Sequence, residues 1–402
     1  MRTVRFDNAH VLDPNGRIER RPLTVTGDRI SHDPTGSPDW QIDCRGALIA
    51  PGLVDIHGDS FERHLMPRPG ARFDAAIGFF DNDKALAANG ITTAYLGVTL
   101  SWEPGLRSTR TGLSFIDAIT RLRHRFVVDT KIHVRLEIHS ADAFDPVIAL
   151  AQDGKLDLVV LNDHLPQHER RLEREPDKEA HWAALAGLSI AELGSLVRQV
   201  RENAEETAHK LTGLLTLLRA QDVTCGSHDD ETPADRERFH LLGAEIAEFP
   251  CNVATARRAK ALGNAVVMGS PNVVRGGSAN GNIPASALIE DGSCTILASD
   301  YYYPSLLHAP FALARRGTMS LADAWALVST NPARALGLVD RGELSPDQRA
   351  DLIVVADWQT TTPRVIATFS RGTPAYVGPE LCASSAPMRS IRRRQGVELE
   401  AN

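Results

Sequence analysis

Short apolar runs alternate with longer stretches of helical spacing through most of this chain. Between residues 51 and about 335, the runs have the length and the apolar character of buried strands. Such alternation is typical of repeated βα units that build a mostly parallel sheet. Strands are expected at 53–56, 92–99, 133–139, 157–163, 222–229, 265–270 and 295–300, with an eighth near 244–250. Eight parallel strands close a ring, so the sequence predicts an α/β fold with a (β/α)8 TIM-like barrel.

The two ends of the chain show a different pattern, in which apolar and polar positions alternate over short segments. Near the N-terminus the alternation is interrupted by turn sequences such as Pro14-Asn15-Gly16. Strand character returns after the barrel region, in ADLIVVAD and the segment that follows it. We therefore predict a small β-sandwich domain built from residues 1–50 plus 341–380, and a barrel that spans residues 51–340.

Two polar segments stand outside this division. Residues 175–221 have helical spacing, which predicts a helical pair on the outer ring of the barrel. Residues 383–402 are polar and contain a run of arginines, which predicts a flexible, solvated tail whose role stays open.

The composition limits the possible partners. The chain has 402 residues and a formal net charge of −7, so its bulk charge does not favour nucleic acid or a membrane surface. An anionic small molecule would need a local group of basic residues. The five cysteines are scattered without a CxxC pair, and the N-terminus lacks a long apolar stretch. We expect a cytoplasmic protein that binds a small molecule; a homo-oligomer is compatible with the sequence.

Imidazole and carboxylate side chains stand at the ends of most of the expected strands. Active sites of β/α barrels lie at the C-terminal ends of the strands, so these side chains should converge. Nitrogen and oxygen ligands of this kind suit zinc, manganese or iron(II). Each residue alone is typical of a helix cap or a hydrogen-bonded core position, but five strands together favour a metal site. The candidate ligands are His57, Asp59, Glu137, His164, His228 and Asp300.

The two ends of the barrel region also resemble a known superfamily. The opening ALIAPGLVDIHGD and the closing STNPARALGLVDRGELSPDQRADLIVVAD are similar to the amidohydrolase superfamily. The resemblance implies a barrel of the amidohydrolase type that binds one or two divalent metal ions, zinc first among them. Matched by residue, His57 and Asp59 would come from the first strand, Glu137 from the fourth as a bridging ligand, His164 from the fifth, His228 from the sixth and Asp300 from the eighth.

Two departures from that pattern leave the number of metal ions open. The second ligand of the first strand is Asp59, where histidine is commoner, and the bridging position holds Glu137 in place of a lysine that could be carboxylated.

A narrower resemblance covers most of the chain. The segments HGDSFERHLMPRPGARF, LNDHLPQ, AEFPCNVATA and MGSPNVVRGGSANGN resemble the family of α-D-ribose 1-methylphosphonate 5-triphosphate diphosphatases of the carbon–phosphorus lyase pathway. The resemblance implies hydrolysis of the triphosphate, which releases pyrophosphate and leaves α-D-ribose 1-methylphosphonate 5-phosphate in the catabolism of organic phosphonates.

Candidate groups for binding the phosphates lie in two loops. Arg275 precedes Gly276, Gly277 and Ser278, a turn whose N–H groups could meet an anion; Arg63 and Arg68 follow the first ligand pair. An ordinary glycine turn and a solvated basic loop are the simpler interpretations. Asp300 is the candidate base that accepts a proton from the attacking water.

Two other functions remain open. An amidohydrolase that cleaves a C–N bond, such as a deacetylase or a cyclic-amide hydrolase, would use the same ligands without the arginines. A non-catalytic barrel in a larger assembly would show broken metal ligands.

Overall fold

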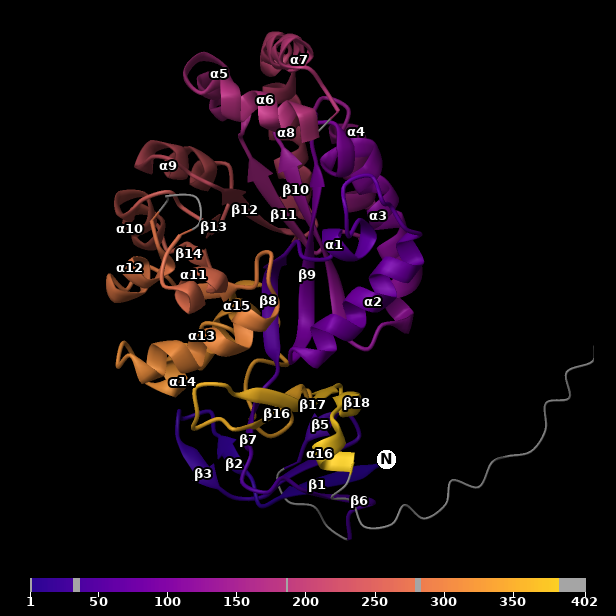
Figure 1. Ribbon diagram of the computed structural model, residues 1–402, viewed down its shortest axis with the longest axis vertical. Helices are drawn as coiled ribbons and strands as arrows, with labels where there is room; N and C mark the ends of the chain where they lie inside the picture. The colour runs from indigo at the N-terminus through magenta and orange to yellow at the C-terminus, as the bar shows by residue number, and fades with distance from the viewer. Residues whose placement is uncertain (1, 32–36, 186, 279–282, 383–402) are drawn as a thin grey trace, which may run out of the picture.

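The computed structural model describes residues 2–31, 37–185, 187–278 and 283–382 (Figure 1). Eight strands in sequence order form one parallel sheet: β8 (Leu53–Gly58), β9 (Ile91–Leu100), β10 (Asp129–Glu137), β11 (Leu158–Asn162), β12 (Thr224–His228), β13 (Ile246–Glu248), β14 (Ala265–Gly269) and β15 (Ile296–Ala298). A bridge between Gly58 and Asp300 joins the first strand to the chain just after the last. The predicted (β/α)8 barrel is confirmed.

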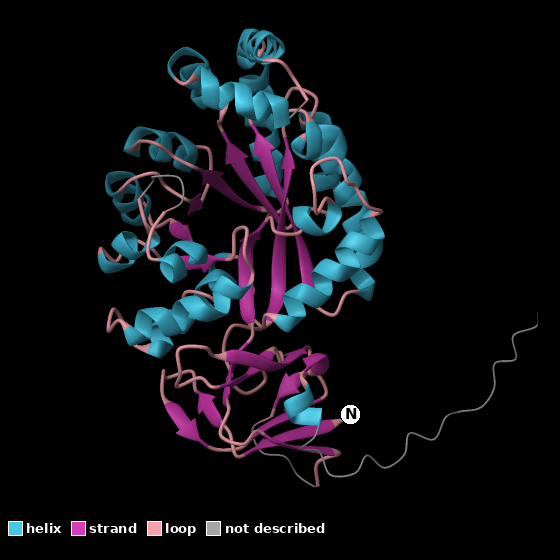
Figure 2. Ribbon diagram, in the orientation of Figure 1, coloured by secondary structure: helices cyan, strands magenta, loops and turns pink. Residues whose placement is uncertain are grey.

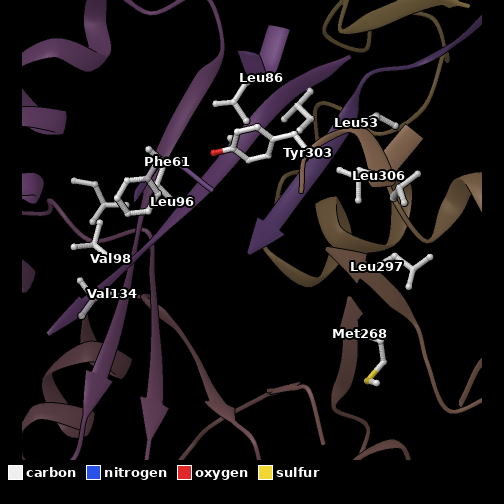
Figure 3. Close-up of a cluster of buried hydrophobic side chains, with 14 of the residues drawn as sticks. Leu53, Phe61, Leu86, Leu96, Val98, Val134, Met268, Leu297, Tyr303 and Leu306 are labelled. Carbon is white, nitrogen blue, oxygen red and sulfur yellow. The ribbon is translucent and has the colours of Figure 1, made fainter. Parts of the chain in front are cut away.

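Helices between the strands surround the barrel (Figure 2). Outward side chains such as Val98 and Val134 pack with Phe61 in the layer between sheet and helices (Figure 3). A second cluster, which includes Ile56 and Ile296, gathers residues from several strands and fills the barrel interior. The helices around the barrel are α1 (Glu62–Leu65), α2 (Ala75–Ala88), α3 (Thr109–Leu122), α4 (Phe144–Gln152), α8 (Ala204–Ala220), α9 (Pro233–Leu241), α10 (Val253–Ala261), α11 (Ser270–Arg275), α12 (Ala285–Glu290), α13 (Pro304–Arg315), α14 (Leu321–Ala326) and α15 (Thr330–Ala335), with short 3-10 turns η1 (Gly105–Arg107) and η2 (Arg123–Arg125).

The polar insert differs from the predicted helical pair. It holds three helices, α6 (Pro176–Leu185), α7 (Ile190–Glu202) and α8, because Gly187 adopts a positive φ and Ser189 begins a new helix with a capping box. Only α8 packs beside α4 on the outer ring. Helices α6 and α7 pack with α5 (Leu165–Arg174) beyond the C-terminal ends of β10 and β11 (Figure 1). The first two helices of the insert thus pack against α5 near the end of the barrel at which an active site is expected.

Both ends of the chain build a smaller β-domain, as predicted. One sheet has the order β5-β4-β1-β6 and the other the order β18-β17-β16-β7-β2-β3, with an apolar cluster that includes Phe6 and Phe369 between them. The strands are β1 (Thr3–Asp7), β2 (His10–Leu12), β3 (Ile18–Arg20), β4 (Leu23–Thr26), β5 (Arg29–Ile30), β6 (Trp40–Asp43), β7 (Leu48–Pro51), β16 (Leu352–Ala356), β17 (Arg364–Ser370) and β18 (Thr373–Val377), followed by α16 (Pro379–Cys382). The division at residues 50 and 340 stays a prediction, and the expected tail at 383–402 lies outside the described residues.

An ion-pair network ties the base of the barrel to the C-terminal segment. Asp129 at the start of β10 lies 2.6 Å from Arg341, 2.8 Å from Arg349 and 3.1 Å from Arg371. Burial disfavours the Asp129 carboxylate, but hydrogen bonds from Arg349 and Arg341 more than offset this and lower its pKa. In the part of the chain that the structure describes, no helix is long and apolar enough to cross a membrane.

Candidate active site

The predicted metal ligands meet at the C-terminal end of the barrel. His57 lies one residue before the end of β8, His228 ends β12, and Asp300 follows β15. Backbone hydrogen bonds from Asp300 to His57 and from Asp59 to Asp300, at 3.0 and 3.1 Å, fix these side chains at the closing point of the barrel. The position of the site therefore follows from strand order and barrel closure.

Three of the strand positions that the resemblance implied are wrong. Glu137 ends β10, the third barrel strand, not the fourth; His164 follows the fourth strand, and His228 ends the fifth. The sixth strand, β13, contributes Glu248, which was not among the predicted residues. Counted along the expected strands, 133–139, 157–163 and 222–229 are already the third, fourth and fifth, so the match to the superfamily assigned each of these ligands to the strand after its own.

Glu248 orients two of the histidines. Its side chain is fully buried, and its Oε2 lies 2.8 Å from His57 Nδ1 and 3.1 Å from His228 Nδ1. An ionised carboxylate only accepts hydrogen bonds, so both Nδ1 atoms carry hydrogen and both Nε2 atoms are left as lone-pair donors. The two rings stack with an interplanar angle of 20° and a centroid separation of 5.4 Å. Burial raises the pKa of Glu248 to about 7 and lowers that of His57 to about 3.

Glu137 holds His164 in place. Its carboxylate accepts the His164 backbone N–H at 2.9 Å and lies 3.1 Å from His164 Nδ1. It is 1% exposed and is not among the residues that line the cavity, whereas His164 is. Burial opposes the charged imidazole, but hydrogen bonds to Asp229 and Glu137 raise the pKa of His164 to about 10. In this geometry Glu137 contacts the site through His164.

Three aspartates give the site its negative charge. Asp59, Asp229 and Asp300 line the cavity, and Asp229 and Asp300 both have positive φ, at 56° and 54°. Such backbone conformations cost free energy outside glycine and cluster at functional sites. Burial, followed by the charge of Asp59, raises the pKa of Asp300 to about 7. A carboxyl with that pKa can exchange a proton near neutral pH.

The donor set fits a divalent cation. The ligand atoms of His57, Asp59 and Asp300 lie within 4.8 Å of one another, and so do those of His164, His228 and Asp229. Imidazole nitrogens backed by a buried carboxylate, together with carboxylate oxygens, are the ligands that zinc and manganese take in proteins. Among the described residues a third group joins His57, His228 and Glu248, but its carboxylate already accepts from both rings, so two groups remain for a cation.

The cavity above these ligands has a volume of about 370 Å³, within the usual range for small-molecule sites. Three arginines line it: Arg107 from η1, Arg135 from β10 and Arg171 from α5. Arg107 lies 3.6 Å from Asp59 and 3.5 Å from Glu62. The remaining lining residues are His57, Asp59, Thr99, Ser101, Glu103, Asn162, His164, Gln167, His168, His228, Asp229, Phe249, Pro250, Met268, Asn272, Ser278, Ile283, Asp300 and Tyr301.

The residues predicted to bind phosphate lie outside the cavity lining, with one exception. Ser278 lines the cavity, and the others do not: Arg63, Arg68, Arg275, Gly276 and Gly277. The segment before the glycines forms α11, and Gly276, with φ of 83°, is its C-terminal cap, so the turn ends a helix. Arg275 donates to the Tyr301 hydroxyl at 3.2 Å, and the Arg63 guanidinium lies 5.9 Å from the Tyr301 ring. Both therefore reach the cavity wall only through Tyr301.

A buried cluster attaches α5 to the barrel. His168 lies between Glu103, 2.9 Å from its Nε2, and Glu179 of α6 at its Nδ1. Burial disfavours the charged ring, but hydrogen bonds to both glutamates raise the pKa of His168. Because His164, Gln167, His168 and Arg171 recur at helical spacing, one face of α5 lines the cavity. The sequence analysis made no prediction for this helix.

Comparison with known proteins gives the family. The Amidohydrolase family model matches residues 220–375. An α-D-ribose 1-methylphosphonate 5-triphosphate diphosphatase from Escherichia coli (strain K12) is 33% identical over 319 residues, which cover 78% of this chain and 84% of that protein.

Solved structures show the same fold at lower sequence identity. N-isopropylammelide isopropylaminohydrolase from Burkholderia multivorans superimposes with a TM-score of 0.61 at 18% identity, over 94% of this chain and all of that one. A 5-methylcytosine deaminase from Klebsiella pneumoniae superimposes with a TM-score of 0.59 at 14% identity, over 92% of this chain and 97% of that one. The chain therefore belongs to the amidohydrolase superfamily and, within it, to the family of the Escherichia coli diphosphatase.

Proposed function

We propose that this hydrolase cleaves α-D-ribose 1-methylphosphonate 5-triphosphate into α-D-ribose 1-methylphosphonate 5-phosphate and pyrophosphate. The observation that carries the proposal is that Arg107, Arg135 and Arg171 converge on one cavity with the histidine and aspartate cluster, in a chain of net charge −7. Guanidinium groups suit phosphate oxygens because they donate in a planar fork and stay charged. The named activity of the Escherichia coli relative supports the same substrate.

His57, Asp59 and Asp300 are the proposed ligands of a divalent cation, with His164, His228 and Asp229 as the neighbouring group. Such a cation, zinc in our proposal and manganese or iron(II) as alternatives, would lower the pKa of water and offset phosphate charge. Glu248 leaves the Nε2 lone pair of His57 directed at the cation, and Glu137 positions His164.

Asp300 is the proposed general base. A water molecule gives its proton to the Asp300 carboxylate while its oxygen attacks the phosphorus nearest the ribose. The bond from that phosphorus to the bridging oxygen breaks, and the electron pair leaves with pyrophosphate. The raised pKa of Asp300, about 7, suits a group that must accept and then release a proton. Arg171, which lines the same cavity from α5, is the proposed ligand of the outer phosphates as negative charge grows on the leaving group.

Pyrophosphate release tests the proposal. The purified chain, loaded with zinc or manganese, is incubated with α-D-ribose 1-methylphosphonate 5-triphosphate, and the products are followed by 31P NMR. The expected products are pyrophosphate and the 5-phosphate, with activity lost on chelation and in Asp300→Asn. Stepwise release of orthophosphate, or no turnover by a metal-loaded, folded chain, would contradict it. Cleavage of N-acyl or cyclic-amide substrates at comparable rates would instead favour the C–N hydrolase.

A further inference from the structure

A buried arginine lies among the candidate metal ligands. Arg135 extends from β10 into the site, and its side chain is 5% exposed. Its Nη2 lies 2.9 Å from His228 Nε2, and its Nη1 lies 3.9 Å from the Asp59 carboxylate. The guanidinium thus stands between the two groups of ligands described above.

The contact with His228 uses the atom that a metal ion would need. Because His228 Nδ1 faces Glu248, the only lone pair on the ring is at Nε2. Arginine stays protonated and has no lone pair to offer a metal, so Arg135 can only donate to that nitrogen. A cation bound to His228 would lose this hydrogen bond and would lie beside a fixed positive charge.

In the second group of ligands, no arginine occupies the nitrogen that would bind a metal ion. His57, Asp59 and Asp300 come together at the closing point of the barrel, and His57 Nε2 has no hydrogen-bond partner among the described residues. At 3.9 Å, the Arg135 guanidinium can lower the negative charge around Asp59 without occupying the lone pairs of His57.

We propose that Arg135 takes the place of a second metal ion, so that the enzyme holds one divalent cation at His57, Asp59 and Asp300. Arg135 then supplies the second positive charge of the site and is directed toward the phosphate under attack. This inference rests on the proposed metal dependence, but it concerns the number of ions and does not depend on which substrate is cleaved.

Substitution of Arg135 separates charge from shape. Arg135→Met removes the guanidinium and keeps an apolar stem, Arg135→Gln removes the charge but keeps polarity, and Arg135→Lys keeps a positive charge. Arg171→Met is the matched control, because it removes an arginine that lines the same cavity but has no described contact with a candidate ligand.

The readout is the ratio of metal to protein after loading the full chain with zinc and removing free ions, measured by mass spectrometry. Manganese loading adds a spectroscopic test, since two adjacent manganese ions give a spin-coupled electron paramagnetic resonance signal. We expect one ion in the wild type, Arg135→Lys and Arg171→Met. We expect two ions and a coupled signal in Arg135→Met and Arg135→Gln.

Two ions in the wild type would overturn the inference, and so would one ion or none in a folded Arg135→Met and Arg135→Gln. If both neutral variants failed to fold, the wild-type ratio and the wild-type manganese signal would still decide it. One ion without pyrophosphate release would refute the proposed reaction and leave the role of Arg135 standing. Two ions with pyrophosphate release would refute the role of Arg135 and leave the proposed reaction standing.

Discussion

Glu248→Gln should weaken metal binding although Glu248 is not itself a proposed ligand. The carboxylate accepts from two imidazole nitrogens at 2.8 and 3.1 Å and is fully buried. Both Nδ1 atoms donate to the same oxygen, Oε2, so a glutamine can keep both contacts through its one amide oxygen but without the negative charge. A neutral acceptor holds the two rings less firmly and makes the Nε2 lone pair of His57, a proposed ligand, less basic.

Loss of one such outer contact typically costs about 10- to 100-fold in metal affinity. Because only one of the two histidines, His57, is a proposed ligand and glutamine loses the charge but keeps the contacts, we expect the lower part of that range, about 10-fold, which corresponds to about 1.4 kcal/mol. The assay is competition for zinc between the protein and a chromophoric chelator. Glu245→Gln is the control, since Glu245 is exposed and lies just before the same strand. Wild-type zinc affinity in a folded Glu248→Gln protein would refute this account of how the histidines are oriented.

Three further predictions concern catalysis, substrate charge and acid stability. Asp300→Asn should still bind metal at saturating zinc, by mass spectrometry, because the amide oxygen can remain a ligand, and it should lose most of kcat, because an amide cannot accept the proton; a near-normal kcat would exclude Asp300 as the base. Arg171→Ala should lower kcat/KM for the triphosphate by about 10- to 100-fold, the cost of one charge-assisted contact. The control is Arg174→Ala, whose side chain is exposed on the same helix, and equal losses in both would refute a specific contact. The lowered pKa of Asp129 means that its stabilising effect is present above about pH 5 and is lost as pH falls through its folded pKa. Asp129→Asn should therefore lower the free energy of unfolding by about 3 kcal/mol at neutral pH, as measured by urea unfolding. The free energy of unfolding of this variant should also fall less than that of the wild type as the pH is lowered below about 5, and an equal fall in both would contradict this.

The barrel and the first ligands could be predicted because the signals are local. A short apolar run followed by His57 and Asp59 shows both the strand and the polar groups at its end. Glu248 and Arg135 gave no such signal, since each is a charged residue inside a strand and would normally lie on a solvated face. Only closure of the barrel, which buries both sides of every strand, directs these side chains into the site.

The binding side of the cavity was harder to predict for a different reason. Arg171 belongs to a polar helix, and the sequence does not show that one face of this helix lines the cavity. The glycines after Arg275 suggested a phosphate-binding turn, but at the end of a helix the same residues form a C-terminal cap. The deciding information in both cases is tertiary packing.

The central claim is that water attacks the phosphorus nearest the ribose in this cavity, and isotope labelling tests it most directly. The reaction is run in 18O-labelled water with the metal-loaded chain, and the products are resolved by 31P NMR. The account predicts one 18O atom in the phosphate of α-D-ribose 1-methylphosphonate 5-phosphate and unlabelled pyrophosphate. Label in the pyrophosphate would place the attack on the next phosphorus and contradict the account.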